Sequence, residues 1–177
     1  MIDPREYTAA ETLKGGLAVT VRALQPEDRE RVAKAVRQLD RASIYFRLFS
    51  FRDELTEAGL DRIMAFDPQR EVALLATLRN GEGETVIGSG RYIVTQPLTA
   101  EVAFMVEEDY HGRGIASRLL RHLAIVARAQ GITTFEADVL AENRPMLVVF
   151  ERTGWPRRTR REGGTVHVTL ELPERLP

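Results

Sequence analysis

The chain has 177 residues, a length that suits one domain and is short for two. Hydrophobic residues make up 44% of the chain and charged residues 29%, which is the balance of a folded globular protein rather than of a disordered one. The absence of cysteine excludes disulfides, thiolate metal sites and cysteine nucleophiles, and three scattered histidines do not predict a metal site.

Charge and hydropathy argue against two classes of partner, nucleic acids and membranes. The formal net charge is -1, whereas general nucleic-acid binders carry a basic excess, so we expect no nucleic-acid partner. No apolar run is long enough to span a membrane, and the first residues show no basic-then-apolar signal pattern. We therefore expect a cytoplasmic protein that does not engage a membrane.

The first half of the chain is predicted to hold a strand, several helices and an antiparallel meander, after a polar N-terminal arm (residues 1–17). Apolar alternation and turn residues indicate the strands, and a proline or threonine near the first turn indicates two of the helices. The expected elements are a strand at 18–24, helices at 26 to about 39, 42–51 and 56–66, and strands at 71–78, 85–94 and 101–106.

The second half is predicted to hold the clearest helix, over residues 114–130, with Gly131 as its C-terminal cap. Its apolar residues recur on one face. Its other face is predicted to be polar, with Ser117, Arg118, Arg121, His122 and Arg128.

A strand at 132–140, a helix at 143–152 and a final hairpin at 155–161 and 165–172 are predicted to follow. The succession of strand, helix and strand over residues 101–140 implies one parallel crossover. We therefore predict a single α/β domain with a mixed, mostly antiparallel sheet and helices on both faces.

The segment from His111 to Ser117, with the sequence HGRGIAS, gives the strongest functional signal. It follows a predicted strand and opens a predicted helix, and its glycines allow a ligand to approach the backbone closely. Free N–H groups and the helix dipole make such a helix start an anion site, so a bound pyrophosphate is one interpretation. A tight strand-to-helix turn without a ligand is the other.

Two familiar glycine loops do not match this segment. The P-loop pattern fails because no lysine stands beside the glycines. The dinucleotide-binding fingerprint fails at its third glycine, which is Ser117 here, although Glu136 or Asp138 lies at a suitable distance for a ribose contact. The dinucleotide fold also needs further strand–helix pairs, and the first half of this chain predicts a meander instead.

The segment resembles the coenzyme A loop of the GNAT superfamily of N-acetyltransferases, whose pattern is [QR]-x-x-G-x-[GA]. Gly114 and Ala116 match it, and His111 replaces the usual Gln or Arg at a mostly structural position. Asn143-x-x-Met146 and the ending around Phe150 resemble the superfamily's later motifs.

The resemblance implies one GNAT-type acetyltransferase domain over residues 1–177, with acetyl-CoA as co-substrate and no metal. The residues that it implies for acetyl-CoA binding are Met105, Val106, His111, Gly112, Arg113, Gly114, Ile115, Ala116, Ser117, Asn143, Met146 and Phe150.

A narrower resemblance is to the bacterial protein-lysine acetyltransferases, and it rests on two segments of the first half of the chain. The opening matches at Tyr7, Glu11, Leu13, Gly16, Val21, Arg22, Leu24, Pro26 and Asp28, and a later segment matches at Ser43, Tyr45, Arg47 and Phe49. This resemblance implies that the acetyl acceptor is a primary amine, with a protein lysine as the expected partner.

Acetyl transfer to an amine needs a base, because a lysine ammonium loses its proton only near pH 10. Glu101 opens the strand that leads into the loop, shares a predicted face with Ala103 and Met105, and resembles the family's catalytic base. Glu107 and Glu108 lie beyond that strand and are weaker candidates.

The resemblance also implies an oxyanion donor and a proton donor. The donor to the oxyanion is a backbone N–H of the strand before the loop, here at Met105 or Val106. The tyrosine that often protonates the leaving thiolate is replaced by Phe150, and Tyr110 is expected to shape the loop.

Several alternatives stay open at this point. The domain could be a catalytically silent coenzyme A-binding module, a small-molecule acetyltransferase for polyamines or aminoglycosides, or a nucleotide-binding regulator. Four arginines of the last hairpin favour a solvated edge strand over an acidic-partner or cofactor contact; they are Arg157, Arg158, Arg160 and Arg161. The oligomeric state is open, a homodimer included.

Overall fold

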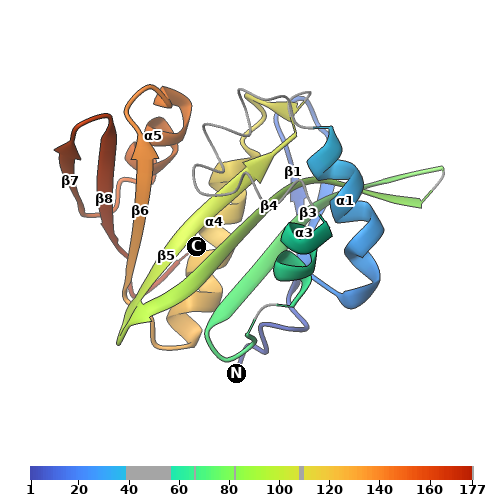
Figure 1. The fold of residues 1–177 in the computed structure, drawn as a ribbon, viewed down its shortest axis with the longest axis horizontal. Coiled ribbons are helices and arrows are strands. Elements are labelled where there is room, and N and C mark those ends of the chain that lie inside the picture. The colour runs from blue at the N-terminus through green and yellow to red at the C-terminus, as the bar shows by residue number, and fades with distance from the viewer. Residues whose placement is uncertain (39–56, 66, 82, 108–109, 177) are drawn as a thin grey trace.

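The computed structural model describes residues 1–38, 57–65, 67–81, 83–107 and 110–176. These residues form one eight-stranded sheet with the strand order β1-β2-β3-β4-β5-β6-β8-β7 (Figure 1). The strands are β1 (Thr8–Thr12), β2 (Ala18–Ala23), β3 (Glu71–Asn80), β4 (Gly83–Gln96), β5 (Thr99–Val106), β6 (Thr134–Leu140), β7 (Arg157–Glu162) and β8 (Thr165–Glu171). The helical elements are the 3₁₀ turn η1 (Pro26–Asp28) and the helices α1 (Arg29–Arg37), α3 (Glu57–Met64), α4 (Ile115–Ala129) and α5 (Arg144–Glu151).

The predicted fold class is confirmed. Every neighbouring pair in the sheet is antiparallel except β5 and β6, which are parallel and are joined through α4. The elements match the predicted ones to within a few residues, and the arm contributes β1 to the edge of the sheet. The helix predicted over 42–51 lies outside the described residues.

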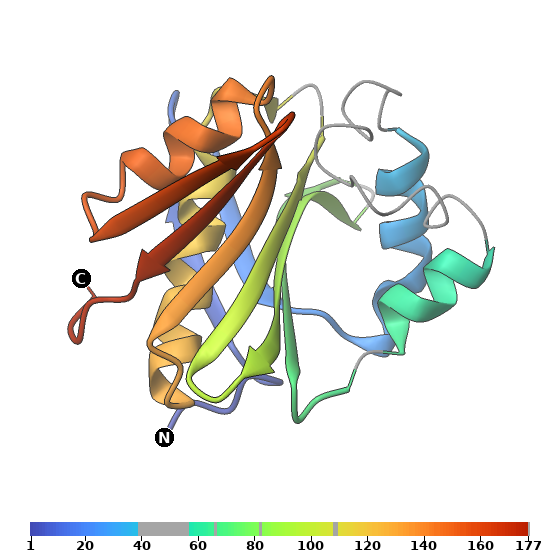
Figure 2. The ribbon, with the colours of Figure 1, turned by 60° about the vertical axis from the view of Figure 1, so that its left-hand side comes forward.

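Helices cover the two faces of the sheet (Figure 2). On one face, α4 and α5 pack into a core that includes the even-numbered residues of β5 and the odd-numbered residues of β6. On the other face, α1 and α3 pack over β3 and β4, together with Met105 of β5. Successive residues of a strand point to opposite faces, so Glu101, Ala103 and Met105 share one face, as predicted. The structure shows that α1 and α3 pack on this face.

The parallel contact between β5 and β6 is short. It joins Thr99 to Thr134, Ala100 to Phe135 and Glu101 to Glu136. Beyond Glu101 no pairing continues, although β5 runs on to Val106 and β6 to Leu140. The two strands therefore part at their C-terminal ends, next to the start of α4.

Two glycines of β4 let α4 lie close to the sheet. A Cβ atom added at Gly88 would lie 2.8 Å from Cγ2 of Ile115 and 3.2 Å from the carbonyl oxygen of Met105. One added at Gly90 would lie 3.0 Å from a methyl group of Leu123. A larger residue at either position would push α4 away from β4, because a packed core does not absorb an added methyl group easily.

The N-terminal arm holds the other side of α4 through a buried polar cluster. Tyr7 contacts Nδ1 of His122 through its hydroxyl at 2.5 Å, and Nε2 of His122 lies 2.7 Å from a carboxylate oxygen of Glu11. Arg121 also donates to Glu11, and the Arg118 guanidinium lies 3.3 Å from the same carboxylate. His122, which was predicted on the polar face of the helix, is thus 5% exposed, because Tyr7 and Glu11 of the N-terminal arm lie against it.

Titration favours a neutral His122 within this cluster. Burial lowers the pKa of His122, and the opposing influence of Glu11 does not restore it. The neutral ring then donates from Nε2 to Glu11 and accepts the Tyr7 hydroxyl proton at Nδ1. Burial alone would raise the pKa of Glu11, but the bonds from His122 and Arg121 outweigh it and the net shift is downward.

A buried ion pair fixes the start of α1 against β2. The Arg22 guanidinium donates two hydrogen bonds to the Asp28 carboxylate, at 2.8 and 2.7 Å, and a third to Glu84 of β4 at 2.8 Å. The backbone N–H of Gln25 also donates to Asp28, which is 1% exposed. Burial acts to raise the pKa of Asp28, but the bonds from Arg22 and Gln25 lower it overall.

We predict that Asp28→Asn destabilises the protein by about 3 kcal/mol at pH 7, because it leaves the half-buried Arg22 guanidinium without its main counter-charge. A carboxyl group whose pKa falls on folding stabilises the fold above its unfolded value, near pH 4, and loses that effect as the pH drops further. The difference in unfolding free energy between wild type and variant, measured by urea denaturation, should therefore shrink below about pH 4.

The matched control is Asp3→Asn, because Asp3 forms an exposed pair with Arg5 at 3.3 Å. That variant should unfold like the wild type at both pH values. Equal stability of the Asp28 and Asp3 variants at pH 7 would contradict the importance of the buried pair.

Candidate functional site

A groove of about 510 Å³ lies where β5 ends and where α4 and α5 begin. One wall is apolar and consists of β5 and α5 side chains, while the other follows the loop before α4. The lining residues are Lys14, Phe104, Val106, Tyr110, His111, Gly112, Gly114, Ile115, Ala116, Ser117, Asn143, Arg144, Pro145, Met146, Val148, Val149 and Arg152.

The loop before α4 is shaped by two glycines in the left-handed region. Gly112 has a φ of 78° and Gly114, the N-cap of α4, has a φ of 87°, values that L side chains rarely adopt. No side chain caps the helix, so the N–H groups of its first turn are free of a capping partner. This start of a 15-residue helix opens onto the groove, and the dipole favours an anion there.

His111 ties this loop back to the sheet. Its Nε2 lies 3.0 Å from the carbonyl oxygen of Val106, the last residue of β5. The N–H of Glu107 points the other way and donates to Ile87 of β4 at 2.9 Å. Because backbone groups alternate along a strand, the N–H of Val106 points toward the parted β6 edge, while that of Met105 points toward β4.

Nine of the twelve residues expected at the cofactor site line the groove, and three do not. Met105 lies on the opposite face of the sheet, in the core beside α1. The guanidinium of Arg113 lies 6.0 Å from the ring centre of Tyr110, outside the groove lining. Phe150 is 2% exposed and packs edge-on against Phe104, with ring centres 6.4 Å apart.

Asn143 combines two roles in the groove. It is 5% exposed, lines the groove, and caps α5 by accepting a hydrogen bond from the Met146 N–H at 3.3 Å. The cap places the first turn of α5 across from the first turn of α4.

Glu101 does not line the groove and lies on the other face of β5, nearer the start of the strand. It forms the last pair with β6, opposite Glu136, immediately before the two strands part. Asp138 is two residues further along β6 and accepts a hydrogen bond from His167 of β8 at 2.7 Å. These side chains share the face of Glu101, so Glu136 and Asp138 point away from the groove in which a ribose contact would lie.

The neighbouring carboxylates change the titration of Glu101. Partial withdrawal from water raises the pKa of Glu101, and the charges of Asp138 and Glu136 raise it further, while His167 acts in the opposite direction. A carboxylate with a raised pKa is a stronger base near neutral pH.

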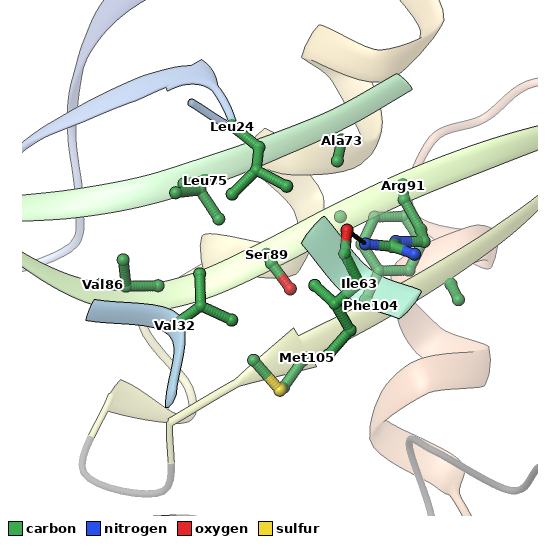
Figure 3. A pocket seen from close by; sticks show the side chains of 12 residues that line it. Leu24, Val32, Ile63, Ala73, Leu75, Val86, Ser89, Arg91, Phe104 and Met105 are labelled. Carbon is green, nitrogen blue, oxygen red and sulfur yellow. Dashed lines mark hydrogen bonds between the residues drawn. The ribbon is translucent and has the colours of Figure 1, made fainter. Parts of the chain in front are cut away.

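A second, smaller cavity of about 40 Å³ lies on the same face as Glu101, between the sheet and the helices α1 and α3. Figure 3 shows its apolar side chains, among them Leu24, Val32 and Leu75, with the guanidinium of Arg91 at one end. Arg91 donates to the carbonyl oxygen of Ile63 at 3.3 Å. Ala103 of β5 lines this cavity too, two residues from Glu101.

The sequence did not predict some of the residues that line the groove. Lys14, in the turn between β1 and β2, lines the groove, as do Arg144 and Arg152 at the two ends of α5. Lys14 was not predicted at the site, because only the tertiary fold brings the turn between β1 and β2 to the loop before α4. Gly88 and Gly90 had a usable signal, because glycine within a strand often marks a close approach of another element.

No group of histidine, aspartate and glutamate residues in the described part of the chain could hold a metal ion. Among the same residues, no helix is long and apolar enough to cross a membrane.

Comparison with known proteins identifies the family of this chain. Residues 35–155 match the model of the Acetyltransferase (GNAT) family. Acetyltransferase PA5475 of Pseudomonas aeruginosa is 33% identical over 137 residues, which cover 77% of this chain and 74% of that protein. Acetyltransferase Pat of Mycolicibacterium smegmatis is 31% identical over 157 residues, which cover 86% of this chain but only 45% of that longer protein.

A solved structure shares the whole fold. The crystal structure of the GNAT domain of S. lividans PAT is 34% identical, superposes with a TM-score of 0.82, and the match covers 93% of this chain and 97% of that domain. The family model covers more than half of the chain, and a relative and a solved structure match it at 33% and 34% identity, so the chain is an acetyltransferase of the GNAT family.

Proposed function

We propose that the protein transfers the acetyl group of acetyl-CoA to the side-chain amine of a protein lysine. The observation that supports this proposal is the parting of β5 and β6 immediately after Glu101, with the groove on one face of the sheet and the Glu101 side chain on the other. A cofactor and an acceptor that arrive from opposite faces can meet in the gap between the parted strands.

The groove suits acetyl-CoA in both shape and chemistry. The pyrophosphate would lie on the backbone N–H groups between Gly112 and Ser117, at the positive end of α4. Lys14 lies in the same wall and supplies a cation for the phosphates. The pantetheine would follow the apolar wall of β5 and α5 toward the point where the strands part.

Glu101 is proposed as the general base. The acceptor arrives as an ammonium and must lose a proton before its nitrogen can form a bond to the acetyl carbon. Glu101 takes that proton, directly or through a water molecule. The amine nitrogen bonds to the acetyl carbon and the C–S bond breaks. The nitrogen then loses its second proton to solvent to give the amide, while the sulfur takes up a proton and coenzyme A leaves as the thiol.

The N–H of Val106 is the proposed donor to the developing oxyanion, in preference to that of Met105. The N–H of Glu107 donates to Ile87 of β4, and successive N–H groups of a strand point to opposite sides. The N–H of Val106 therefore points toward the gap, where it can stabilise an oxyanion. The leaving thiolate cannot take a proton from Phe150. Tyr110 is the phenol among the groove-lining residues, so it or a water molecule would supply that proton.

The choice of a protein lysine as acceptor is supported by two relatives, the Pat proteins, at 31% and 34% identity. A small polyamine or aminoglycoside would use the same base and the same cofactor groove. A coenzyme A-binding module without turnover would use only the groove. Glu101, with its raised pKa beside the gap, favours an enzyme over such a module.

We predict that Glu101→Gln lowers kcat/KM roughly 10²–10⁴-fold, because the amide keeps the shape of the side chain but accepts no proton. The KM for acetyl-CoA should stay nearly unchanged. Release of free thiol with a lysine-containing protein acceptor measures both constants. Glu107→Gln is the control and should remain active; an inactive Glu107 variant beside an active Glu101 variant would transfer the role of base to Glu107.

We predict that Gly114→Trp weakens acetyl-CoA binding at least about tenfold, which corresponds to about 1.4 kcal/mol. The indole would fill the space next to the free N–H groups of α4. Gly131→Trp is the matched control, since Gly131 has a similar φ of 86° at the other end of the same helix, away from the groove. Isothermal titration calorimetry on both folded variants tests the site, and equal affinities would contradict it.

We predict that Asp138→Asn shifts the acid limb of the pH profile of kcat/KM to lower pH. A neighbouring negative charge raises the pKa of Glu101, so removing it lowers that pKa and leaves the base unprotonated in more acidic solution. Glu162→Gln removes a carboxylate from the far end of β7 and should leave the profile unchanged. Identical profiles for wild type and the Asp138 variant would show that Glu101 does not titrate as the base.

A further inference from the structure

The face of the sheet that carries Glu101 continues across three more strands to the arginines of β7. Glu101 pairs with Glu136, Glu136 with Thr169 of β8, and Thr169 with Arg158. Directly paired residues project from the same face of a sheet, so Arg158 stands on the face of the proposed base. Three strand spacings place the two Cα atoms about 14 Å apart.

A second row of paired residues runs parallel to the first. Asp138 pairs with His167, and His167 pairs with Arg160. Arg158 and Arg160 are therefore neighbours on one face, at the outer end of the sheet (Figure 1). Arg157 and Arg161 occupy the alternate positions of β7 and project from the opposite face, opposite Leu170 and Val166.

These arginines are available to a partner. Every residue of β7 is exposed. Within the described ranges, no carboxylate forms a salt bridge with Arg158 or Arg160, although many other arginines of the protein are paired. On this face of β6, β8 and β7, no helix of the described residues packs, whereas α4 and α5 cover the other face.

This face carries a negative region at the gap and a positive region at the outer edge, and a partner with the opposite charges would complement both. Negative side chains surround the gap where the acceptor amine must enter, and positive side chains stand about 14 Å away at the edge. A complementary surface therefore carries its cation in the middle and carboxylates to one side. An extended chain advances about 3.3 Å per residue, so four residues span the distance.

We propose that Arg158 and Arg160 bind carboxylates of the acceptor protein, so that the enzyme prefers lysines that have Asp or Glu about four residues away. The proposal rests on the proposed function, since it assigns the class of lysine that the same site acetylates. A solvated edge strand kept soluble by charge would account for the number of arginines, but it predicts that the arginines of the two faces are equivalent, whereas the proposal gives a role in acceptor binding to Arg158 and Arg160 alone.

The test compares three peptides that each contain a single lysine and differ only at the positions four residues before and after it. These positions hold Glu, Ser or Arg. Thiol release gives kcat/KM for the wild type, for R158E/R160E and for the matched control R157E/R161E, which changes the same charge on the same strand but on the opposite face.

We expect the wild type to prefer the acidic over the neutral peptide by roughly fivefold to tenfold, in keeping with exposed charge pairs. R158E/R160E should reverse that order and favour the basic peptide, while R157E/R161E should keep the wild-type order. The neutral peptide should react at similar rates with all three proteins. The preference should also fade in about 1 M salt, where the Debye length is about 3 Å.

Equal preferences in the two double variants would overturn the inference and leave the proposed function intact. Loss of binding to a DNA duplex in R158E/R160E, with an unchanged peptide preference, would also overturn it and assign the strand to nucleic acid. Absence of thiol release with every lysine peptide and with intact protein acceptors would instead reject the proposed function, and the inference with it.

Discussion

The early parting of β5 and β6 is the feature on which the rest of the site depends. A parallel pair normally continues for as long as both strands do, but here it ends after the pair of Glu101 and Glu136. Nε2 of His111 donates a hydrogen bond to the carbonyl oxygen of Val106. The loop thus supplies the hydrogen-bond partner that a continued pairing with β6 would have given this carbonyl. Phe150 of α5 packs against Phe104 of β5, so α5 contacts β5 beside the place where the strands part. The gap is thus stabilised by a hydrogen bond and by core packing, not left as an unpaired defect.

Residues far from the gap keep the cofactor loop in position. Gly88 and Gly90 allow α4 to lie against β4, and the cluster of Tyr7, Glu11 and His122 holds the same helix from the side of β1. Since the loop before α4 carries the free N–H groups, any shift of the helix moves the anion site relative to β5. The match of Tyr7 and Glu11 to the opening of protein-lysine acetyltransferases therefore has a physical reason in this fold.

Periodicity and turn chemistry were enough to predict the strands, α4, the crossover and the glycine loop. These features are local, because they depend on the alternation along a strand or on the spacing along a helix. The burial of His122 was missed because the helix pattern alone cannot show that an N-terminal strand covers its polar face. Phe150 was expected in the cofactor site from its place in a motif, whereas its side chain lies in the core. The neighbours of Glu101 depend on the register between strands far apart in sequence, which no local pattern encodes.

A crystal structure with a bound bisubstrate would show where the two substrates meet in the protein. In such a compound a short acetyl bridge joins the sulfur of coenzyme A to the Nζ atom of a lysine peptide. We expect the pyrophosphate to lie on the N–H groups between Gly112 and Ser117, the bridge to pass through the gap beyond Glu101, and the peptide to leave on the face of Glu101. A peptide that emerges on the side of α4 and α5, or a pyrophosphate bound away from the start of α4, would contradict this expectation.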